Sequence, residues 1–298
     1  DSSLSNSILR EISKIFKDSK TSIVYKKVNL PRVKALNYAI SLATSEYLLR
    51  FDSRTRFSKN YAEEAIKLLN EKNKIKLTTG AVGGRQSPLP ANSTKKAKLA
   101  SELFERSYVF GNPLYRRKKY SGKVNSIYLG CFPKEILQKT KYRDRVNLIS
   151  EDSQLSKDII SQGYLIYISQ NIKVNYLCRE NIFLVMKLLR NYGRCRARTI
   201  ISTRTIHDKK KYFLLLILIF VLPIFLFSLI KDITISFLLV LLIPIIYNTF
   251  YEILNYGLKK ILYMPLIALL AQLNWIIGVL ETLLLYFFVK NKKSNFLK

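Results

Sequence analysis

Two short segments of this chain, 50–57 and 150–156, carry acidic side chains that could bind a metal ion or transfer a proton. Asp52 closes the apolar segment 46–51, and Arg54 follows two positions later. A pair of acids at the end of a strand can hold a divalent metal, because hard cations prefer carboxylate oxygens. Here the second position carries a cation. The segment RFDSRTRF is therefore a damaged metal site, a variant of one, or an ordinary strand end.

The second acidic segment is SEDSQLS at 150–156. Ser150 can cap a helix whose first turn holds Glu151 and Asp152, where carboxylates interact favourably with the helix dipole. Acids in a first helical turn are common for that reason alone. The pattern by itself is thus compatible with a purely stabilising role as well as with chemistry.

The elements that would carry these residues alternate between short apolar runs and helical patterns, which favours an α/β sheet with crossover connections. Ligands of such sheets bind beyond the carboxyl ends of the strands. Asp52, Gly83–Gly84, Gly130 and Glu151–Asp152 therefore become the positions of interest. We expect strands at 21–27, 46–52, 75–84, 124–130 and 164–176, and helices at 31–43, 59–72, 94–110, 151–162 and 181–200.

The C-terminal part of the chain is apolar enough for a membrane. It contains two stretches of 19 residues without a charged side chain, at 212–230 and 233–251. Roughly 20 apolar residues span a bilayer, so both predict transmembrane helices. The segment 261–289 either crosses once at a steep tilt or turns near Asn274–Gly278 and returns. The flanking lysines favour the second arrangement, with all basic flanks on the cytoplasmic side.

The formal net charge of +30 has three competing explanations. Basic residues could attract anionic lipids, since many lie at 190–211 beside the apolar segments. They could equally reflect a compositional preference for lysine. Nucleic-acid binding ranks below both because of the apolar C-terminal part. Three cysteines without ligand spacing and a single histidine, His207, argue against a zinc site, a disulfide framework and a Ser-His-Asp hydrolase.

Short motifs follow one another through most of the chain in a definite order. They are DSS at 1–3, ALN at 35–37, FDSR at 51–54, GG at 83–84, SIYLGCFPKE at 126–135, SEDSQLS at 150–156 and NYGRCRAR at 191–198. This order resembles the family 2 glycosyltransferases of GT-A type, inverting enzymes that use nucleotide sugars. The resemblance is greatest to the succinoglycan-biosynthesis glucosyltransferase branch, whose metal strand reads Arg-x-Asp-Ala-His-x-Arg.

The resemblance implies an α/β GT-A domain with a mostly parallel sheet over 1–208, followed by a membrane anchor over 209–298. DSS would match a turn after the family's second strand, so the first strand, first helix and second strand are expected to be missing before Asp1. Asp1 and Asn37 would contact the nucleotide sugar. Asp52 would bind Mg²⁺ or Mn²⁺ against the diphosphate. Asp152 would be the general base, with Glu151 orienting it.

Two arginine positions keep alternative interpretations. Arg54 could neutralise diphosphate charge directly, or it could exclude the metal. Arg194 and Arg196 could stabilise the leaving diphosphate, or they could attract the membrane surface. Cys195 stands where processive members of the wider family carry Trp, which favours addition of a single sugar.

The resemblance thus implies a transferase at the cytoplasmic membrane, with its catalytic domain facing the cytoplasm, that moves a hexose from a nucleotide sugar to a lipid-linked saccharide acceptor in polysaccharide assembly. Its partners would be the sugar donor, the acceptor and membrane lipids. A processive synthase and a non-catalytic, truncated binding protein are the alternatives. The donor sugar, the acceptor and the linkage are not encoded in any motif.

Overall fold

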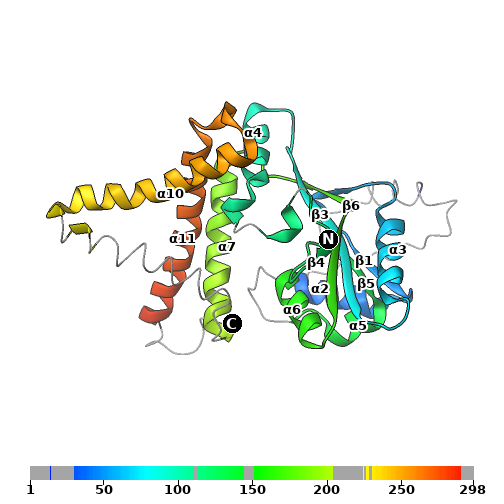
Figure 1. The fold of residues 1–298 in the computed structure, drawn as a ribbon. Helices are drawn as coiled ribbons and strands as arrows, with labels where there is room; N and C mark the ends of the chain where they lie inside the picture. The colour runs from blue at the N-terminus through cyan, green and yellow to red at the C-terminus, as the bar shows by residue number, and fades with distance from the viewer. Residues whose placement is uncertain are drawn as a thin grey trace.

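In the computed structural model, a sheet forms the centre of the fold, with six strands among the residues that the structure describes, and long helices extend from one side of it (Figure 1). The structure describes residues 14, 30–110, 113–117, 119–143, 151–203, 224, 226–227 and 230–289. The expected strand at 21–27 and most of the apolar segment 212–230 lie outside these residues. So do Asp1, Ser150 and His207.

The strand order is β1-β5-β3-β6-β2, and the short β4 pairs with β6. Only β3 and β6 pair in parallel among the described strands, whereas the other four pairings are antiparallel. The predicted α/β class is confirmed, but a mostly parallel sheet is wrong for this part of the chain. The strands are β1 (Tyr47–Arg50), β2 (Thr55–Phe57), β3 (Thr79–Leu89), β4 (Gly122–Lys123), β5 (Gly130–Pro133) and β6 (Leu165–Leu177).

Helices cover both faces of the sheet because buried side chains alternate along the strands. Ala81 and Phe132 face one apolar cluster, which contains α2, α5 and α6 side chains, whereas their neighbours Val82 and Cys131 face another, which contains α3 side chains. The helices of the sheet region are α2 (Arg32–Leu42), α3 (Tyr61–Asn73), α4 (Lys95–Glu105), α5 (Lys134–Thr140) and α6 (Glu151–Ser161).

Two predicted strand boundaries are wrong. We expected the strand 75–84 to end at Gly84, but β3 continues to Leu89, with a register shift against β6 between Gly84 and Arg85. A Cβ atom on Gly84 would overlap the carbonyl group of Ile172, so glycine allows the close approach of the two strands. The expected strand 124–130 is replaced by β4 before it and β5 after it.

In the described part of the chain, three long helices follow the sheet: α7 (Ile182–Thr203), α10 (Ile233–Tyr256) and α11 (Met264–Val289). α7 and α11 lie side by side with their N-terminal ends at the same end of the pair (Figure 1). A Cβ atom on Gly193 of α7 would overlap the carbonyl oxygen of Trp275, and one on Gly278 of α11 would overlap that of Arg190. These two glycines therefore bring the helix backbones into direct contact.

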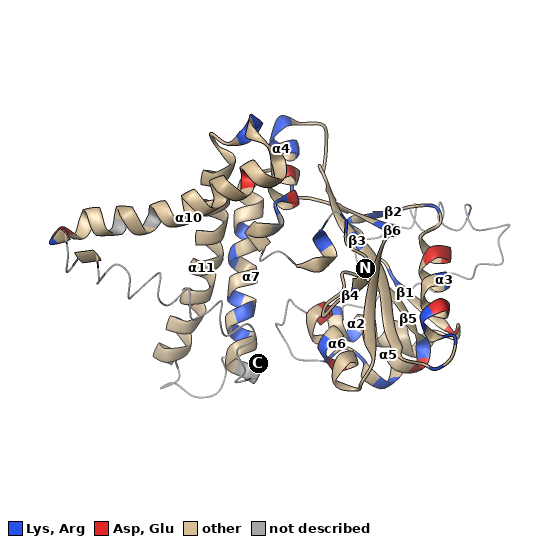
Figure 2. Ribbon diagram, viewed as in Figure 1, with Lys and Arg blue, Asp and Glu red and all other residues tan. Residues whose placement is uncertain are grey.

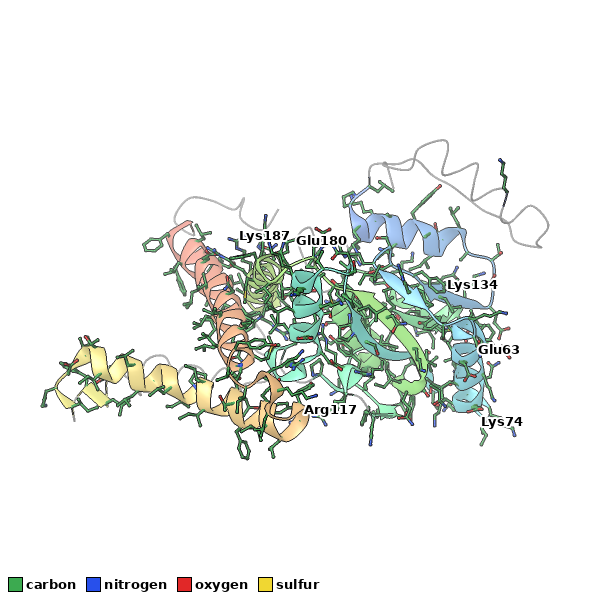
Figure 3. The ribbon with its side chains drawn as sticks, turned by 90° about the horizontal axis from the view of Figure 1, so that it is seen from above. Glu63, Lys74, Arg117, Lys134, Glu180 and Lys187 are labelled. Carbon is green, nitrogen blue, oxygen red and sulfur yellow. The ribbon has the colours of Figure 1, made fainter. Side chains whose placement is uncertain are left out.

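α10 and α11 are the two described helices that are long and apolar enough to cross a membrane, with mean hydropathies of 2.2 and 1.8. α10 projects away from the rest of the molecule, which is also clear from above (Figure 3). α11 is one continuous helix, so the favoured turn near Asn274–Gly278 is wrong. At 1.5 Å per residue, its 26 residues measure about 39 Å.

A third apolar cluster joins the two predicted domains. Phe104 and Tyr108, next to the sheet, pack with Leu189 of α7 and with Met264 and Ala268 of α11. The described helices of the predicted membrane anchor thus share a core with the α/β part of the chain.

Candidate active site

Arg50 occupies the centre of the candidate site. It ends β1, and its side chain is only 7% exposed. Its Nε donates to Asp52 Oδ1 at 3.3 Å, and Nη2 donates to Glu151 Oε1 at 3.2 Å. Nη1 forms a short contact with Asp152 Oδ1 and donates to the hydroxyl of Tyr142 at 3.1 Å. One guanidinium group therefore gathers three carboxylates from two distant parts of the chain.

A second arginine closes the same cluster from the solvent side. Arg32 begins α2, and its side chain is 59% exposed. Its Nη2 lies 3.0 Å from Asp52 Oδ2, and its Nε lies 2.8 Å from Glu151 Oε1. Each oxygen of Asp52 thus meets a different arginine, and one oxygen of Glu151 is shared by both.

The first turn of α6 supplies the two remaining acids. Glu151 and Asp152 lie at the N-terminus of the helix, where the dipole favours negative charge. The side chain of Glu151 is 8% exposed, whereas that of Asp152 is 26% exposed. Of these two acids of α6, Asp152 is therefore the one that solvent can reach.

Burial dominates the electrostatics of this cluster. It raises the pKa of Asp152 to about 6, because desolvation outweighs the attraction of Arg50. Burial opposes the charge of Arg50, but Asp152, Tyr142 and Asp52 together raise its pKa above the ordinary arginine value. A carboxylate with a pKa near 6 is ionised at neutral pH and still basic enough to accept a proton.

Asn37 supports the cluster from a distance. Its side-chain nitrogen donates to the carbonyl oxygen of Tyr142 at 2.7 Å, and its oxygen accepts from the backbone nitrogen of Tyr142 at 2.9 Å. Tyr142 in turn presents its hydroxyl to Arg50. Both ends of the Asn37 amide are thus used to hold Tyr142, whereas the family resemblance implied a contact with the nucleotide sugar.

The side chains around Asp52 do not fit the predicted Mg²⁺ or Mn²⁺. Both carboxylate oxygens of Asp52 face guanidinium groups, which would repel a cation placed between them. No group of three acidic, histidine or cysteine side chains suited to a metal ion occurs among the described residues. The metal-binding role of Asp52 thus remains a prediction without support from this arrangement.

Arg54 lies outside the carboxylate cluster. Its Nε donates to the carbonyl oxygen of Leu177 at 3.3 Å, and Nη2 donates to that of Cys178 at 2.9 Å. The backbone nitrogen of Leu177 returns a bond to the carbonyl oxygen of Arg54 at 2.8 Å. The side chain therefore fastens the start of β2 to the end of β6.

The basic helix α7 carries the remaining predicted arginines. Arg194 Nε donates to Glu281 Oε2 of α11 at 2.9 Å, and Arg190 pairs with the other oxygen of the same glutamate. Arg196 is half-buried and forms no ion pair with a described residue. Figure 2 shows lysine and arginine along α7, while α10 is almost free of charge between its ends.

The structure thus brings together Asp52, Glu151 and Asp152, as predicted, and keeps Arg54, Arg194 and Asn37 in other contacts. Sequence reasoning missed Arg50, Arg32 and Tyr142. A signal for Arg50 was present, because a charge inside the apolar run EYLLRFD must find partners if the strand is buried. The sequence offers no comparable signal for Arg32 or Tyr142.

A cavity of about 720 Å³ opens at the other end of β1. Its lining includes Glu46 and Tyr47 at the start of that strand, Pro133 at the end of β5, and the side chains of Lys74 and Lys134. Figure 3 shows both lysines on the side of the sheet that lies away from α7. The cavity therefore lies at the opposite end of β1 from the carboxylate cluster.

No family model matches this chain, and no curated protein matches it in sequence. Among solved structures, the chain is similar to the mannosyltransferase PcManGT from Pyrobaculum calidifontis, in complex with GDP-mannose and Mn²⁺. The identity is 14%, the TM-score is 0.49, and the match covers 95% of this chain and 76% of that one.

Proposed function

We propose that this chain is a membrane-anchored inverting glycosyltransferase of family 2. It would transfer a hexose from a nucleotide-diphosphate sugar to a lipid-linked saccharide acceptor in polysaccharide biosynthesis. The observation that carries the proposal is the meeting of Asp52 with Glu151 and Asp152. The two motifs lie about a hundred positions apart in the sequence, and in the fold their acids contact the same arginine, Arg50.

Asp152 is the general base in this proposal. A sugar hydroxyl is a weak nucleophile, so a carboxylate must take its proton as the anomeric carbon is attacked from the face opposite the diphosphate. Asp152 is the most exposed acid of α6's first turn, and Arg50 and the helix N-terminus fix its direction. Glu151, held between two arginines, orients the turn that carries Asp152.

The departing diphosphate requires positive charge. Arg32 is the cluster's solvent-facing cation, and a guanidinium fork suits phosphate oxygens. Arg194 and Arg196 remain candidates for the same task on α7, although Arg194 already pairs with Glu281. Asp1 stays a candidate for the nucleotide and lies outside the described residues.

Membrane anchoring is supported by α10. Its exposed side chains include large apolar ones along most of its length, such as Ile235, Leu238, Leu242, Ile246 and Phe250. Such a surface in water is costly, and a bilayer would cover it. The anchor would hold the site close to an acceptor whose lipid tail lies in the membrane, with the catalytic part on the cytoplasmic side, where the basic flanks are expected.

The test uses the full chain in membranes or detergent, with hydrolysis of, and transfer from, a panel of nucleotide sugars as the readout. Asp152→Asn should lower the rate by about 10²–10⁴-fold, the usual contribution of a general base. Asp158→Asn is the matched control, because Asp158 lies in the same helix and pairs with Arg143 instead. Its rate should stay close to that of the parent.

Equal rates for the parent and Asp152→Asn would remove the base assignment. No turnover by the parent with any donor would instead favour a non-catalytic binding protein. Membrane anchoring is checked separately: carbonate washing of membranes should leave the protein in the pellet, and its release would contradict a spanning anchor.

A further inference from the structure

Arg50 uses every nitrogen of its guanidinium group inside the carboxylate cluster. Nε contacts Asp52, Nη2 contacts Glu151, and Nη1 contacts both Asp152 and the Tyr142 hydroxyl. The side chain is almost wholly enclosed. Four of its five N–H donors therefore contact side chains of the protein itself, three carboxylates and one hydroxyl.

Carboxylate oxygens are the ligands that a hard divalent cation prefers, and here three carboxylates surround one guanidinium group, each against a different nitrogen. The positive charge at the centre of this cluster is therefore covalently attached to β1. A divalent ion would need the same oxygens, and it would also meet the positive charge of Arg50 at close range. The two cations exclude each other from this position.

The charge balance supports this interpretation. The contacting side chains carry three negative charges, from Asp52, Glu151 and Asp152, and two positive charges, from Arg50 and Arg32. Removal of Arg50 would leave three carboxylates against Arg32 alone. Buried carboxylates at such density need a counter-ion or must take up protons.

We propose that Arg50 is a built-in counter-ion that occupies the place of a divalent cation among Asp52, Glu151 and Asp152, so that the site works without a metal. Arg50 is thus a positioning residue that joins the end of β1 to the start of α6. The proposal takes its site from the proposed function, but its main measurement needs no sugar donor.

The experiment measures Mn²⁺ binding to the full chain in detergent, by loss of the free-ion signal in electron paramagnetic resonance. The parent should bind no Mn²⁺ at this site. Arg50→Ala should gain one bound ion, at least about tenfold tighter than any binding by the parent. Addition of Asp52→Asn to Arg50→Ala should weaken that gain. Arg54→Ala is the matched control, because its arginine lies two positions away and outside the cluster.

Stoichiometric Mn²⁺ binding by the parent that Asp52→Asn abolishes would overturn the proposal. So would a folded Arg50→Ala that gains no ion. Arg50→Lys should keep the parent's indifference to Mn²⁺, because the ammonium retains the charge although it lacks the fork. Metal-dependent stabilisation of Arg50→Lys would count against the proposal.

A second measurement on the parent keeps the test independent of whether Arg50→Ala folds. Binding of UDP and GDP is compared in Mn²⁺ and in EDTA, and the affinities should agree within about twofold, well under the 1.4 kcal/mol of a tenfold change. Loss of more than tenfold in EDTA would overturn the proposal. If neither nucleotide binds, the proposed function fails, and the Mn²⁺ results still decide the role of Arg50.

Discussion

Two buried arginines of this protein form contrasting ion-pair clusters. Arg106 follows α4 and meets a single acid, Glu252 of α10, through a two-point contact of 2.6 and 3.2 Å. Both side chains are enclosed, at 5% and 0% exposed. Arg50 meets three acids, and two of them, Asp52 and Asp152, are partly open to solvent. The first cluster is balanced and closed, and the second is acidic and open.

The difference separates a structural ion pair from a site. Arg106 is completed by the backbone carbonyl of Glu102 and by the ring of Tyr256, so nothing in its surroundings calls for another ligand. In the Arg50 cluster, the acids outnumber the contacting arginines, and an exposed arginine lies at the edge. The cluster therefore carries an excess of negative charge, which a proton or a positively charged group of a ligand can neutralise.

The largest expected effect concerns the closed pair. Glu252→Met keeps the volume of the side chain but leaves Arg106 buried without its partner. We expect a loss of about 3–5 kcal/mol in the free energy of unfolding, seen as a lower melting temperature. Arg106→Met combined with Glu252→Met should recover most of the loss. A double variant as unstable as Glu252→Met alone would show that the pair contributes more than charge compensation.

The next effect concerns the open cluster and its pH dependence. Burial raises the pKa of Asp152 to about 6, and the base must be ionised to act. The transfer rate should therefore be highest above this pKa and fall about tenfold per pH unit below it. Rates of the parent and of Asp158→Asn between pH 4.5 and 8 should follow the same curve. A flat profile would mean that Asp152 is not the titrating base.

The smallest effect concerns Arg54, which belongs to neither cluster. Arg54→Met removes two hydrogen bonds to the end of β6, and we expect about 1 kcal/mol of lost stability with nearly unchanged nucleotide affinity. Arg56→Met, at an exposed position of β2 nearby, is the control. A large drop in nucleotide affinity for Arg54→Met alone would restore the diphosphate role that the sequence suggested.

Much of the α/β part of the chain could be predicted from its sequence. The helices at 31–43, 59–72 and 151–162 are confirmed within one or two residues as α2, α3 and α6. These segments show a helical spacing of apolar residues, which is a local signal. Strand pairing is not local. The continuation of β3 beyond Gly84 depends on β6, which lies about eighty positions later in the chain.

The same reasoning explains what was missed in the site. The motifs located Asp52, Glu151 and Asp152, because acids at a strand end and a helix start are visible in a sequence. Their pairing through Arg50 is not visible, since its partners in α6 come about a hundred residues later. Arg54 was weighed as the cation of the site, but Arg50, four positions earlier, takes that place.

The cluster of Phe104, Tyr108, Leu189, Met264 and Ala268 bears on how the chain can be handled in the laboratory. A fragment that ends at the predicted boundary near residue 208 would retain the first three of these side chains and lose the two that cover them. The uncovered apolar patch would promote self-association. The C-terminal helices therefore shield an apolar surface of the α/β part from water. A soluble fragment for crystallisation would need polar replacements on that surface.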